Sequence, residues 1–449
     1  MSKNLSGEAI RAVLTRRWKS IKSIMKNLKY KKAAPVRRVL TRMAKEGVVE
    51  SIKLGGMTYW RLTKAEAKVK KHVTKEKERA HEESMKTADD ILKELKGVGL
   101  DLYGQLSSGR FPSLDVPSRS TSNIKFDPIS RQYILAGRMV TRSARNIGQI
   151  KSLTQLIWVM RFVRELLRMN KSSTLRDVYY SSEAYKIKFL DQQESDSLIT
   201  DVEAVIETPR EDFKIFPEER SAIYGDLTVE YTTPEKYRGK RVNMMDNPDG
   251  VMIGPHLINS KFVNCGADKI IAIESGGMFT RFIEEGVHES FNALLLHTAG
   301  QAPRSTRRLI RRLHYEFNIP AYVFTDGDPW GVHIAMVIIS GSATAAHLRG
   351  LATPDAVWMG VWASDIEKYN LPTDKFTEQD IKRTKELRKD PRYRTKFWQD
   401  QLSKFLSIKR KAEQQAFSRY GLTYVVDEYL PAKFKEIDKL KRKGIIQTG

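Results

Sequence analysis

Two short apolar segments, each followed directly by carboxylates, constrain the fold more than any other feature of this sequence. Lys269–Ile273 is an almost uninterrupted apolar run that ends at Glu274 and a glycine pair. Residues 322–325 form a second such run, and Asp326-Gly327-Asp328 follows it. Apolar runs of this length are typical of strands buried on both faces, as in parallel sheets. The sequence therefore predicts a sheet whose strands end in acidic side chains.

Helices and a further strand alternate with these two runs. A helix is expected from Met278, a strand over residues 292–297, and a basic amphipathic helix over residues 304–317. Strands that alternate with helices predict a doubly wound α/β domain. In such domains the functional edge is where the carboxyl ends of the strands converge.

Glu274, Asp326 and Asp328 are the candidate ligands of a metal ion. The two aspartates are two residues apart on an extended segment, so their side chains point the same way. Three neighbouring carboxylates repel one another unless one is protonated or a cation lies between them. Hard oxygen ligands, with water completing the shell, suit Mg²⁺.

A tyrosine pair beside an arginine is the candidate for covalent chemistry. Residues 150–167 and 194–206 have the apolar spacing of helices, and Arg176, Tyr179 and Tyr180 lie between them. A tyrosine hydroxyl has a pKa of about 10, so a nucleophilic tyrosine needs help to lose its proton. It also needs a cation to balance charge on the phosphorus under attack. On a helix Arg176 neighbours both tyrosines, and the spacing does not choose between them.

Ordinary structural roles stay open for both groups of residues. Residues 326–329 are also compatible with a surface turn, and Glu274 with a helix cap. The tyrosine pair is also compatible with burial beside a structural salt bridge from Arg176 to Asp177 or Glu183.

The first 64 residues carry more than half of the net charge. They contain 17 Lys and Arg against 3 Asp and Glu, a net charge of +14 within the +24 of the whole chain. Helix-like stretches over 7–19, 21–28 and 35–45 precede alternating segments over 48–54 and 57–62. Three helices followed by a hairpin are the order of a winged helix, whose third helix enters the major groove.

Arg37, Arg38 and Arg42 on that third helix are the predicted phosphate contacts. The alternative is a basic module that binds another protein, although an ordinary solvated face would carry both signs of charge.

Composition bounds the class of protein. A chain of 449 residues with 41% hydrophobic residues is long enough for about three folded domains. A net charge of +24 indicates a polyanionic partner. The single cysteine, Cys265, excludes a disulfide framework and a cysteine-based zinc site. Neither a signal peptide nor a membrane span is expected.

The predicted architecture is multidomain, with α/β and winged-helix parts. Its boundaries are residues 1–64 for the basic winged helix, 65–96 for a charged linker helix, 97–215 for a second winged-helix domain with the tyrosine, 216–264 for a connecting segment, and 265–449 for the α/β domain with a C-terminal extension.

The acidic constellation looks like the Toprim domain of topoisomerases, primases and related nucleases, which has a Rossmann-like α/β fold. Type IA and type IIA topoisomerases place Toprim before the tyrosine domain, whereas here the tyrosine comes first. That order, with residues 174–180 (TLRDVYY), resembles the A subunit of the archaeal type IIB DNA topoisomerase VI family and its relative, the meiotic double-strand-break transesterase. Further resemblance lies in residues 192–196 (QQESD), 224–226 (YGD), 297–304 (HTAGQAPR), 362–366 (WASDI) and 411–416 (KAEQQA).

The resemblance covers roughly residues 97–435 and implies roles for single residues. Tyr180, the second tyrosine, would be the nucleophile, with Arg176 assisting, in a CAP-like winged-helix domain. Glu274, Asp326 and Asp328 would carry Mg²⁺, as one ion or two. The basic winged helix of residues 1–64 has no counterpart in the family core.

The basic helix over residues 304–317 adds Arg304 and Arg307 as predicted DNA contacts.

The resemblance also implies an ATP-hydrolysing type II DNA topoisomerase, an isomerase that makes transient double-strand breaks in DNA through a 5′-phosphotyrosyl link. One nucleophile in each chain implies a homodimer, because both strands are cut. The sequence has no Walker-type phosphate loop, so ATP would enter through a partner. The resemblance names that partner as a GHKL-type ATPase B subunit in an A₂B₂ assembly, with residues 97–125 as its expected docking region. We expect a cytoplasmic protein associated with double-stranded DNA of the nucleoid.

Three other functions stay open at this point. The first is a stand-alone double-strand-break transesterase that needs no B subunit. The second is a non-catalytic DNA-binding regulator with a degenerate Toprim domain. The third is a Toprim nuclease that hydrolyses DNA with water and forms no protein adduct.

Overall fold

The chain forms two compact units, Met1–Met85 and Lys86–Gly449. The computed structural model describes residues 14, 19–27, 33–45, 48–54, 57–63 and 86–446. The boundary predicted at residue 97 falls inside helix α5 (Ala88–Ser107), and most of the linker helix predicted over 65–96 lies outside the described residues. Within these ranges, every helix is too short or too polar to cross a membrane.

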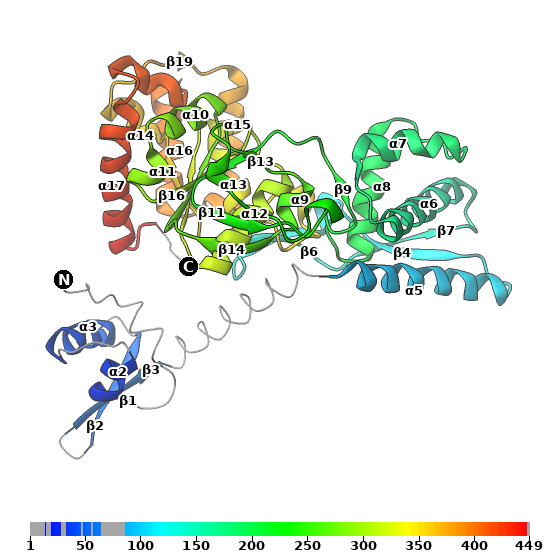
Figure 1. Ribbon diagram of the computed structural model, residues 1–449, viewed down its shortest axis with the longest axis horizontal. Coiled ribbons are helices and arrows are strands. Elements are labelled where there is room, and N and C mark those ends of the chain that lie inside the picture. Colours follow the sequence, from blue (N-terminus) through cyan, green and yellow to red (C-terminus); the bar gives the residue numbers. More distant parts are fainter. Residues whose placement is uncertain are drawn as a thin grey trace. The chain divides into compact units, whose positions relative to one another are not determined.

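The first unit combines helices with a small antiparallel sheet of strand order β1-β3-β2 (Figure 1). Its elements are β1 (Lys19–Ser20), α2 (Ile21–Asn27), α3 (Ala33–Lys45), β2 (Val49–Leu54) and β3 (Met57–Leu62). Val36, Leu40 and Met43 recur along α3 at spacings of four and three residues, and all three are buried. α3 therefore packs through one apolar face and leaves its basic face outside.

The elements predicted for this unit are confirmed where the structure describes them. α2 and α3 correspond to the predicted second and third helices, and β2 and β3 to the predicted hairpin. The first helix, predicted over residues 7–19, lies almost entirely outside the described residues, and Lys19 belongs to β1.

The second unit begins with a mainly helical part that contains the tyrosine pair. Its elements are α5, β4 (Ser113–Pro117), β5 (Ile124–Asp127), β6 (Gln132–Leu135), β7 (Met139–Ser143), α6 (Ile147–Met169), β8 (Ser173–Thr174), α7 (Leu175–Ala184), α8 (Gln192–Val205) and β9 (Ile215–Phe216). The predicted helices over 150–167 and 194–206 are confirmed as α6 and α8. Asn146 caps the start of α6, and Asn170 ends it in the left-handed conformation that asparagine tolerates.

A six-stranded sheet of order β13-β10-β16-β15-β17-β18 forms the centre of the remaining part (Figure 1). The four strands from β16 to β18 are parallel, and the two others are antiparallel. The strands are β10 (Ala222–Tyr224), β13 (Val251–Met252), β15 (Lys269–Ile273), β16 (Ala293–His297), β17 (Ala321–Phe324) and β18 (Val357–Gly360). The larger helices are α10 (Gly276–Glu284), α12 (Arg304–Phe317), α13 (Pro329–Ser340), α15 (Glu378–Lys389), α16 (Lys396–Ile408) and α17 (Leu430–Arg442). The strands and the helix predicted here are confirmed as β15, β16, β17 and α12.

Residues 216–264, predicted as a connecting segment, contribute two strands to this sheet. β10 pairs with β16, and β13 pairs with β10. The segment also forms a separate sheet of β12 (Arg241–Asn243), β11 (Leu227–Glu230) and β14 (Lys261–Cys265). Strands as short as β10 and β13, with 3 and 2 residues, carry no recognisable alternation and become regular only through pairing with a neighbour.

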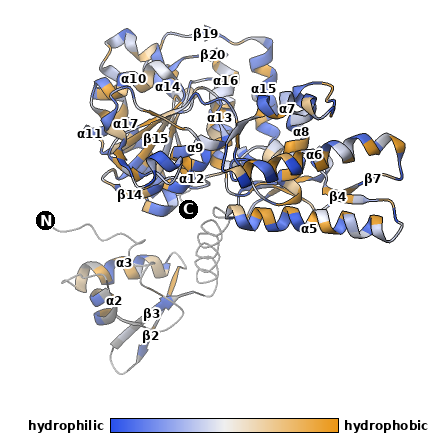
Figure 2. Cartoon of the chain, turned by 45° about the vertical axis from the view of Figure 1, so that its right-hand side comes forward, coloured by the Kyte–Doolittle hydropathy of each residue, from blue (hydrophilic) through white to orange (hydrophobic). Residues whose placement is uncertain are grey.

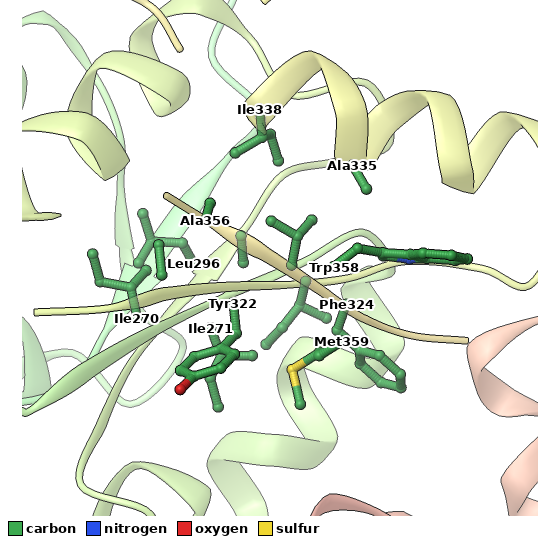
Figure 3. Close-up of a cluster of buried hydrophobic side chains, with 14 of the residues drawn as sticks. Ile270, Ile271, Leu296, Tyr322, Phe324, Ala335, Ile338, Ala356, Trp358 and Met359 are labelled. Carbon is green, nitrogen blue, oxygen red and sulfur yellow. The ribbon is translucent and has the colours of Figure 1, made fainter. Parts of the chain in front are cut away.

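Side chains on both faces of the parallel strands are buried, as their apolar sequences require. Figure 3 shows Ala335 and Ile338 of α13 on one side of the strands, and Tyr322 and Met359 on the other. In Figure 2 the strands of this sheet are coloured as hydrophobic, whereas the surrounding helices are mixed. The sheet therefore gives rigid support to the side chains at the carboxyl ends of its parallel strands.

Buried ion pairs join the tyrosine-bearing part to α12. The Glu203 carboxylate of α8 is fully buried, with Arg304 Nη1 at 2.5 Å from its Oε1 and His347 Nε2 at 3.0 Å from its Oε2. Arg308 pairs in the same way with Asp212. Burial alone would raise the pKa of the Glu203 carboxyl, but Arg304 and His347 lower that pKa to about 2. Within the second unit, α8 and α12 are thus held together by charges excluded from water.

We expect Glu203→Gln to destabilise the second unit by about 3–5 kcal/mol near pH 7, because Arg304 loses its buried counter-charge. The folded-state pKa of Glu203 lies below the ordinary value of 4.5, so the ion pair stabilises the fold above that pH and the contribution is lost as the pH falls toward 2. Chemical unfolding at a series of pH values should show a flatter acid limb for the variant. Glu165→Gln, whose side chain is 43% exposed, is the control. Parallel acid limbs for Glu203→Gln and wild type would contradict this assignment.

Candidate functional site

Glu274 and Asp326 lie side by side at the carboxyl ends of two adjacent parallel strands. β15 and β17 pair with Ile273 opposite Phe324. The backbone N–H of Asp326 donates to Glu274 Oε2 at 3.0 Å. The sheet edge thus brings together two carboxylates that are far apart in the sequence.

Burial and mutual repulsion disfavour the charged forms of these carboxyls. Burial, and then the charge of Asp326, raises the pKa of Glu274 to about 7. Burial raises the pKa of Asp326 to about 6, with Asp328 and Glu413 adding to the shift. Burial also raises the pKa of Asp328, against the lowering effect of two backbone N–H groups. Carboxyls in this state favour a proton or a cation between them.

Asp328 also caps helix α13. Its Oδ1 accepts hydrogen bonds from the N–H groups of Trp330 at 2.8 Å and Gly331 at 2.7 Å. Glu274 is not a cap, because Ser275 occupies the N-cap position of α10. The helix-cap alternative weighed for Glu274 is therefore wrong, and the cap at Asp328 uses only one of its oxygens.

We expect Gly331→Ala to distort this edge. A Cβ atom on Gly331 would lie 2.2 Å from the carbonyl oxygen of Asp326, a backbone atom that cannot move alone. The variant should lose about 1–3 kcal/mol of unfolding free energy, which thermal and chemical denaturation would measure. Gly350→Ala is the matched control, since a Cβ there meets nothing within 4 Å. Equal stability of the two variants would show that the turn adapts freely.

The chemistry of this donor set fits a hard divalent cation. Three repelling carboxyls lie at one sheet edge, and a cation would relieve their repulsion. In the part of the chain that the structure describes, no group of three or more His, Cys, Asp or Glu side chains is already placed to hold a metal ion. Backbone N–H groups occupy Glu274 Oε2 and Asp328 Oδ1. An ion would therefore be held by the other carboxylate oxygens, with water completing its shell.

A C-terminal segment reaches the same edge, and the sequence predicted no role for it. Lys411 Nζ lies 3.0 Å from Asp380 Oδ2, and the charge of Lys411 partly opposes the rise that burial causes in the pKa of Asp328. The backbone N–H of Gln414 donates to Asp326 Oδ1 at 2.8 Å. The signal in the sequence was residues 411–416 (KAEQQA), which carry the family resemblance but no chemistry of their own.

Tyr180 is the exposed member of the tyrosine pair. Its side chain is on helix α7 and is 59% exposed. Tyr179 is half-buried, with its ring centroid 5.4 Å from that of Tyr180 and 6.5 Å from that of Phe189. The alternative of a buried tyrosine pair therefore does not fit, and the exposed hydroxyl is the one that a large substrate can reach.

Arg176 stands one helical turn before Tyr180 and is also exposed. Its Nη1 lies 3.6 Å from Glu218 Oε1, with side-chain exposures of 63% and 64%. Its partner is thus neither Asp177, which forms the capping box of α7 with Thr174, nor Glu183. Exposed pairs of this kind contribute little stability, so Arg176 can exchange Glu218 for another anion at small cost.

One chain does not bring the tyrosine to the carboxylates. Within residues 86–446, α7 packs mainly against α8 and β8. Figure 1 shows α7 in a different lobe from α10, which begins two residues after Glu274.

The structure places Arg37, Arg38 and Arg42 on the exposed face of α3, as the sequence predicts.

The burial of Arg304 and Arg307 does not agree with their predicted role as DNA contacts. Arg304 is paired with Glu203, and Arg307 is 5% exposed. Burial and the neighbouring charge of Arg304 lower the pKa of Arg307 to about 10. On helix α12, Arg304 faces Glu203 of α8, and Arg307 is buried near Glu211. Both acidic residues are far from α12 in the sequence, so the burial of these arginines became visible only in the fold.

Two family models match the sequence. The model for the Toprim domain of topoisomerase 6 A subunits and Spo11 matches residues 269–434, which include all three carboxylates. The model described as "Type IIB DNA topoisomerase" matches residues 151–215, which include Arg176 and Tyr180.

Curated relatives share most of this length. The A subunit of type 2 DNA topoisomerase 6 from Methanothermobacter thermautotrophicus is 44% identical, over 79% of this chain and 99% of its own. The proteins of the same name from Archaeoglobus fulgidus and Methanosarcina acetivorans are 40% and 39% identical, over 77% and 78% of this chain and 97% and 95% of their own.

Proposed function

Because the chain belongs to the family of topoisomerase VI A subunits, which are type IIB DNA topoisomerases, we propose that Tyr180 is the residue that cuts DNA and that Glu274, Asp326 and Asp328 bind Mg²⁺ beside the cleaved strand. The catalytic A subunit of such an enzyme breaks and rejoins DNA. What the proposal adds is which residues of this chain do so.

The tyrosine step is a transesterification. The Tyr180 oxygen attacks a backbone phosphorus, a bond forms between that oxygen and the 5′ phosphate, and the bond to the 3′ oxygen breaks. The phenolic proton is released and the departing 3′ oxygen gains one, so the charge is balanced. The phosphodiester energy is kept in the new link, and resealing needs no nucleotide.

Arg176 and the carboxylates would stabilise different charges during cleavage. Arg176, exposed one turn from Tyr180, would face the phosphate under attack and balance its developing charge. Mg²⁺, when bound, would neutralise charge on the neighbouring phosphates. Glu274, Asp326 and Asp328 would hold it at the rigid edge of the sheet.

The proposal includes a homodimer on double-stranded DNA. One chain offers one Tyr180, and both strands must be cut. Since α7 and the acidic edge lie in different lobes of one chain, Tyr180 of one protomer would act beside the carboxylates of its partner. The proposed location is the cytoplasm, on DNA of the nucleoid.

The proposal also includes an ATPase B subunit that docks near α5, in an A₂B₂ assembly. Large apolar side chains are exposed along the end of α5 and just after it: Leu100, Tyr103, Leu106 and Phe111. Exposed apolar groups gathered in this way are typical of a protein contact.

We assign the first unit to DNA binding as a winged helix. The support is the hairpin β2–β3 beside α3, whose exposed face carries Arg37, Arg38 and Arg42.

Deleting residues 1–64, with a net charge of +14, is expected to flatten the dependence of DNA affinity on salt, because fewer counterions are released. Fluorescence anisotropy across salt concentrations would measure the slope. An unchanged slope would indicate that this segment faces a protein partner.

The observation that carries the proposal is the crowding of carboxyls at the strand ends of a chain that also displays Tyr180. Its test is to trap the covalent intermediate. Supercoiled plasmid, Mg²⁺ and the protein are incubated with and without an ATP analogue and the ATPase partner, then denatured and digested with protease. Linear DNA with a 5′-linked peptide supports the proposal. An adduct formed without the ATPase partner would identify a stand-alone enzyme, and free 5′ phosphates a hydrolytic nuclease.

A further inference from the structure

The segment that precedes the C-terminal helix closes over the acidic edge. Gly327, between the two aspartates, exchanges backbone hydrogen bonds with Ala412: its N–H donates to Ala412 O at 2.8 Å, and it accepts from Ala412 N–H at 3.2 Å. A Cβ on Gly327 would lie 3.2 Å from Ala412 O and 3.1 Å from Val361 Cβ, so any side chain at this position would crowd its neighbours. The Asp-Gly-Asp turn is thus held from outside the sheet.

Gln414 is the residue of this segment whose side chain bonds to the ends of both strands. It is 0% exposed. Its Oε1 accepts from the N–H of Ser275 at 3.1 Å, and its Nε2 donates to the carbonyl oxygen of Phe324 at 2.6 Å. Its own N–H donates to Asp326 Oδ1 at 2.8 Å.

These contacts connect the ends of both strands that carry the carboxylates. Ser275 directly follows Glu274, and Phe324 precedes Asp326 by two residues. The N–H of Glu274 also donates to Phe324 O at 3.0 Å, so the two strand ends and Gln414 share one hydrogen-bonded junction. Each polar atom of the Gln414 side chain bonds to a backbone group, and the side chain is fully buried.

We propose that Gln414 is a positioning residue, whose buried amide fixes the spacing of Glu274 and Asp326 against their mutual repulsion and so prepares them to hold a divalent cation. This inference rests on the proposed metal-binding role of those carboxylates. A neutral donor–acceptor is required at this place, because a carboxylate would add a further negative charge and lose the donor to Phe324. An apolar side chain would leave the Ser275 N–H and one lone pair of Phe324 O unpaired in a buried site. Residues that orient metal ligands in this way typically change metal affinity by about 10–100-fold when replaced.

The test measures Mn²⁺ binding by electron paramagnetic resonance and by calorimetry on the full chain without DNA, and thermal unfolding in EDTA. Gln414→Met keeps the volume of the side chain and removes both hydrogen bonds, and Gln414→Ala is the second variant. We expect Mn²⁺ affinity to fall about 10–100-fold in either variant. Gln155→Met is the matched control: Gln155 is 2% exposed and donates to Lys188 O at 2.8 Å in the tyrosine-bearing part. It should lose stability without losing Mn²⁺ affinity.

The outcomes separate the two proposals. Wild type that binds no Mn²⁺, or binds it as well as Glu274→Gln does, would overturn the metal-binding role itself. Wild-type affinity in Gln414→Met, with Glu274→Gln defective, would leave the metal site standing and reduce Gln414 to a packing residue. A Gln414→Met variant whose melting temperature lies further below that of wild type in excess Mn²⁺ than in EDTA supports the proposal, because the added difference measures its weaker Mn²⁺ binding.

Discussion

Tyr180→Phe is expected to abolish the covalent adduct between this protein and DNA, with a loss of cleavage on the order of 10⁴-fold or more, as for removal of a nucleophile in other covalent catalysts. The substitution removes one exposed hydroxyl and no packing, so the fold and DNA affinity should be unchanged. Adduct yield is measured on plasmid after denaturation and protease treatment, and DNA binding by anisotropy.

Tyr179→Phe is the matched control, because it removes the same atom from the adjacent residue of the same helix. Tyr179 is half-buried, with its ring against Tyr180 and Phe189, and should retain cleavage. If Tyr179→Phe loses the adduct and Tyr180→Phe keeps it, the nucleophile is the other tyrosine of the pair. If both variants keep it, the transesterase role of α7 is wrong.

Glu274→Gln is expected to have two opposite effects: loss of Mg²⁺-dependent cleavage and greater stability without metal. The variant keeps an acceptor for the Asp326 N–H and removes one of three repelling charges. In EDTA at pH 8 it should be more stable than wild type by roughly 2–3 kcal/mol, from a pKa raised to about 7 by burial and the charge of Asp326. Functional sites commonly carry such a cost in stability.

The sign of this effect depends on pH. The Glu274 pKa lies above the ordinary 4.5, so wild-type stability falls as the pH rises from 4.5 through 7, and the two proteins should converge near pH 4. Chemical unfolding in EDTA at pH 4 and pH 8 measures the difference. Glu289→Gln, 81% exposed, is the control. A Glu274→Gln variant that is less stable than wild type at pH 8 would show that Glu274 contributes to the fold rather than to a strained site.

The parallel strands and the acidic edge could be predicted from the sequence, for a reason visible in Figure 3. Strands buried on both faces need continuous apolar runs, so β15 and β17 can be predicted from the sequence. Because these strands are parallel neighbours, their carboxyl ends meet at one edge of the sheet. The helices α6, α8 and α12 could be predicted because each has a long amphipathic repeat. Strands β10 and β13 could not be predicted, because a segment of two or three residues is too short to show a periodic pattern.

Side-chain environments in the site were less accessible to sequence reasoning. Arg304 has the charge and helix position of a DNA contact, and only its pairing with Glu203 shows otherwise. Gln414 has no distinctive chemistry, and its role follows from three hydrogen bonds to partners at least 88 residues away.

The amino-acid sequence by itself determined the family, the strand ends that carry Glu274, Asp326 and Asp328, and the tyrosine pair beside Arg176, because these depend on local periodicity and on the chemistry of single residues. The tertiary structure alone decided which tyrosine is exposed, which arginines are buried, and which amide ties the acidic strands together. Those properties depend on burial and on contacts between distant segments, and neither quantity is defined until the chain has folded.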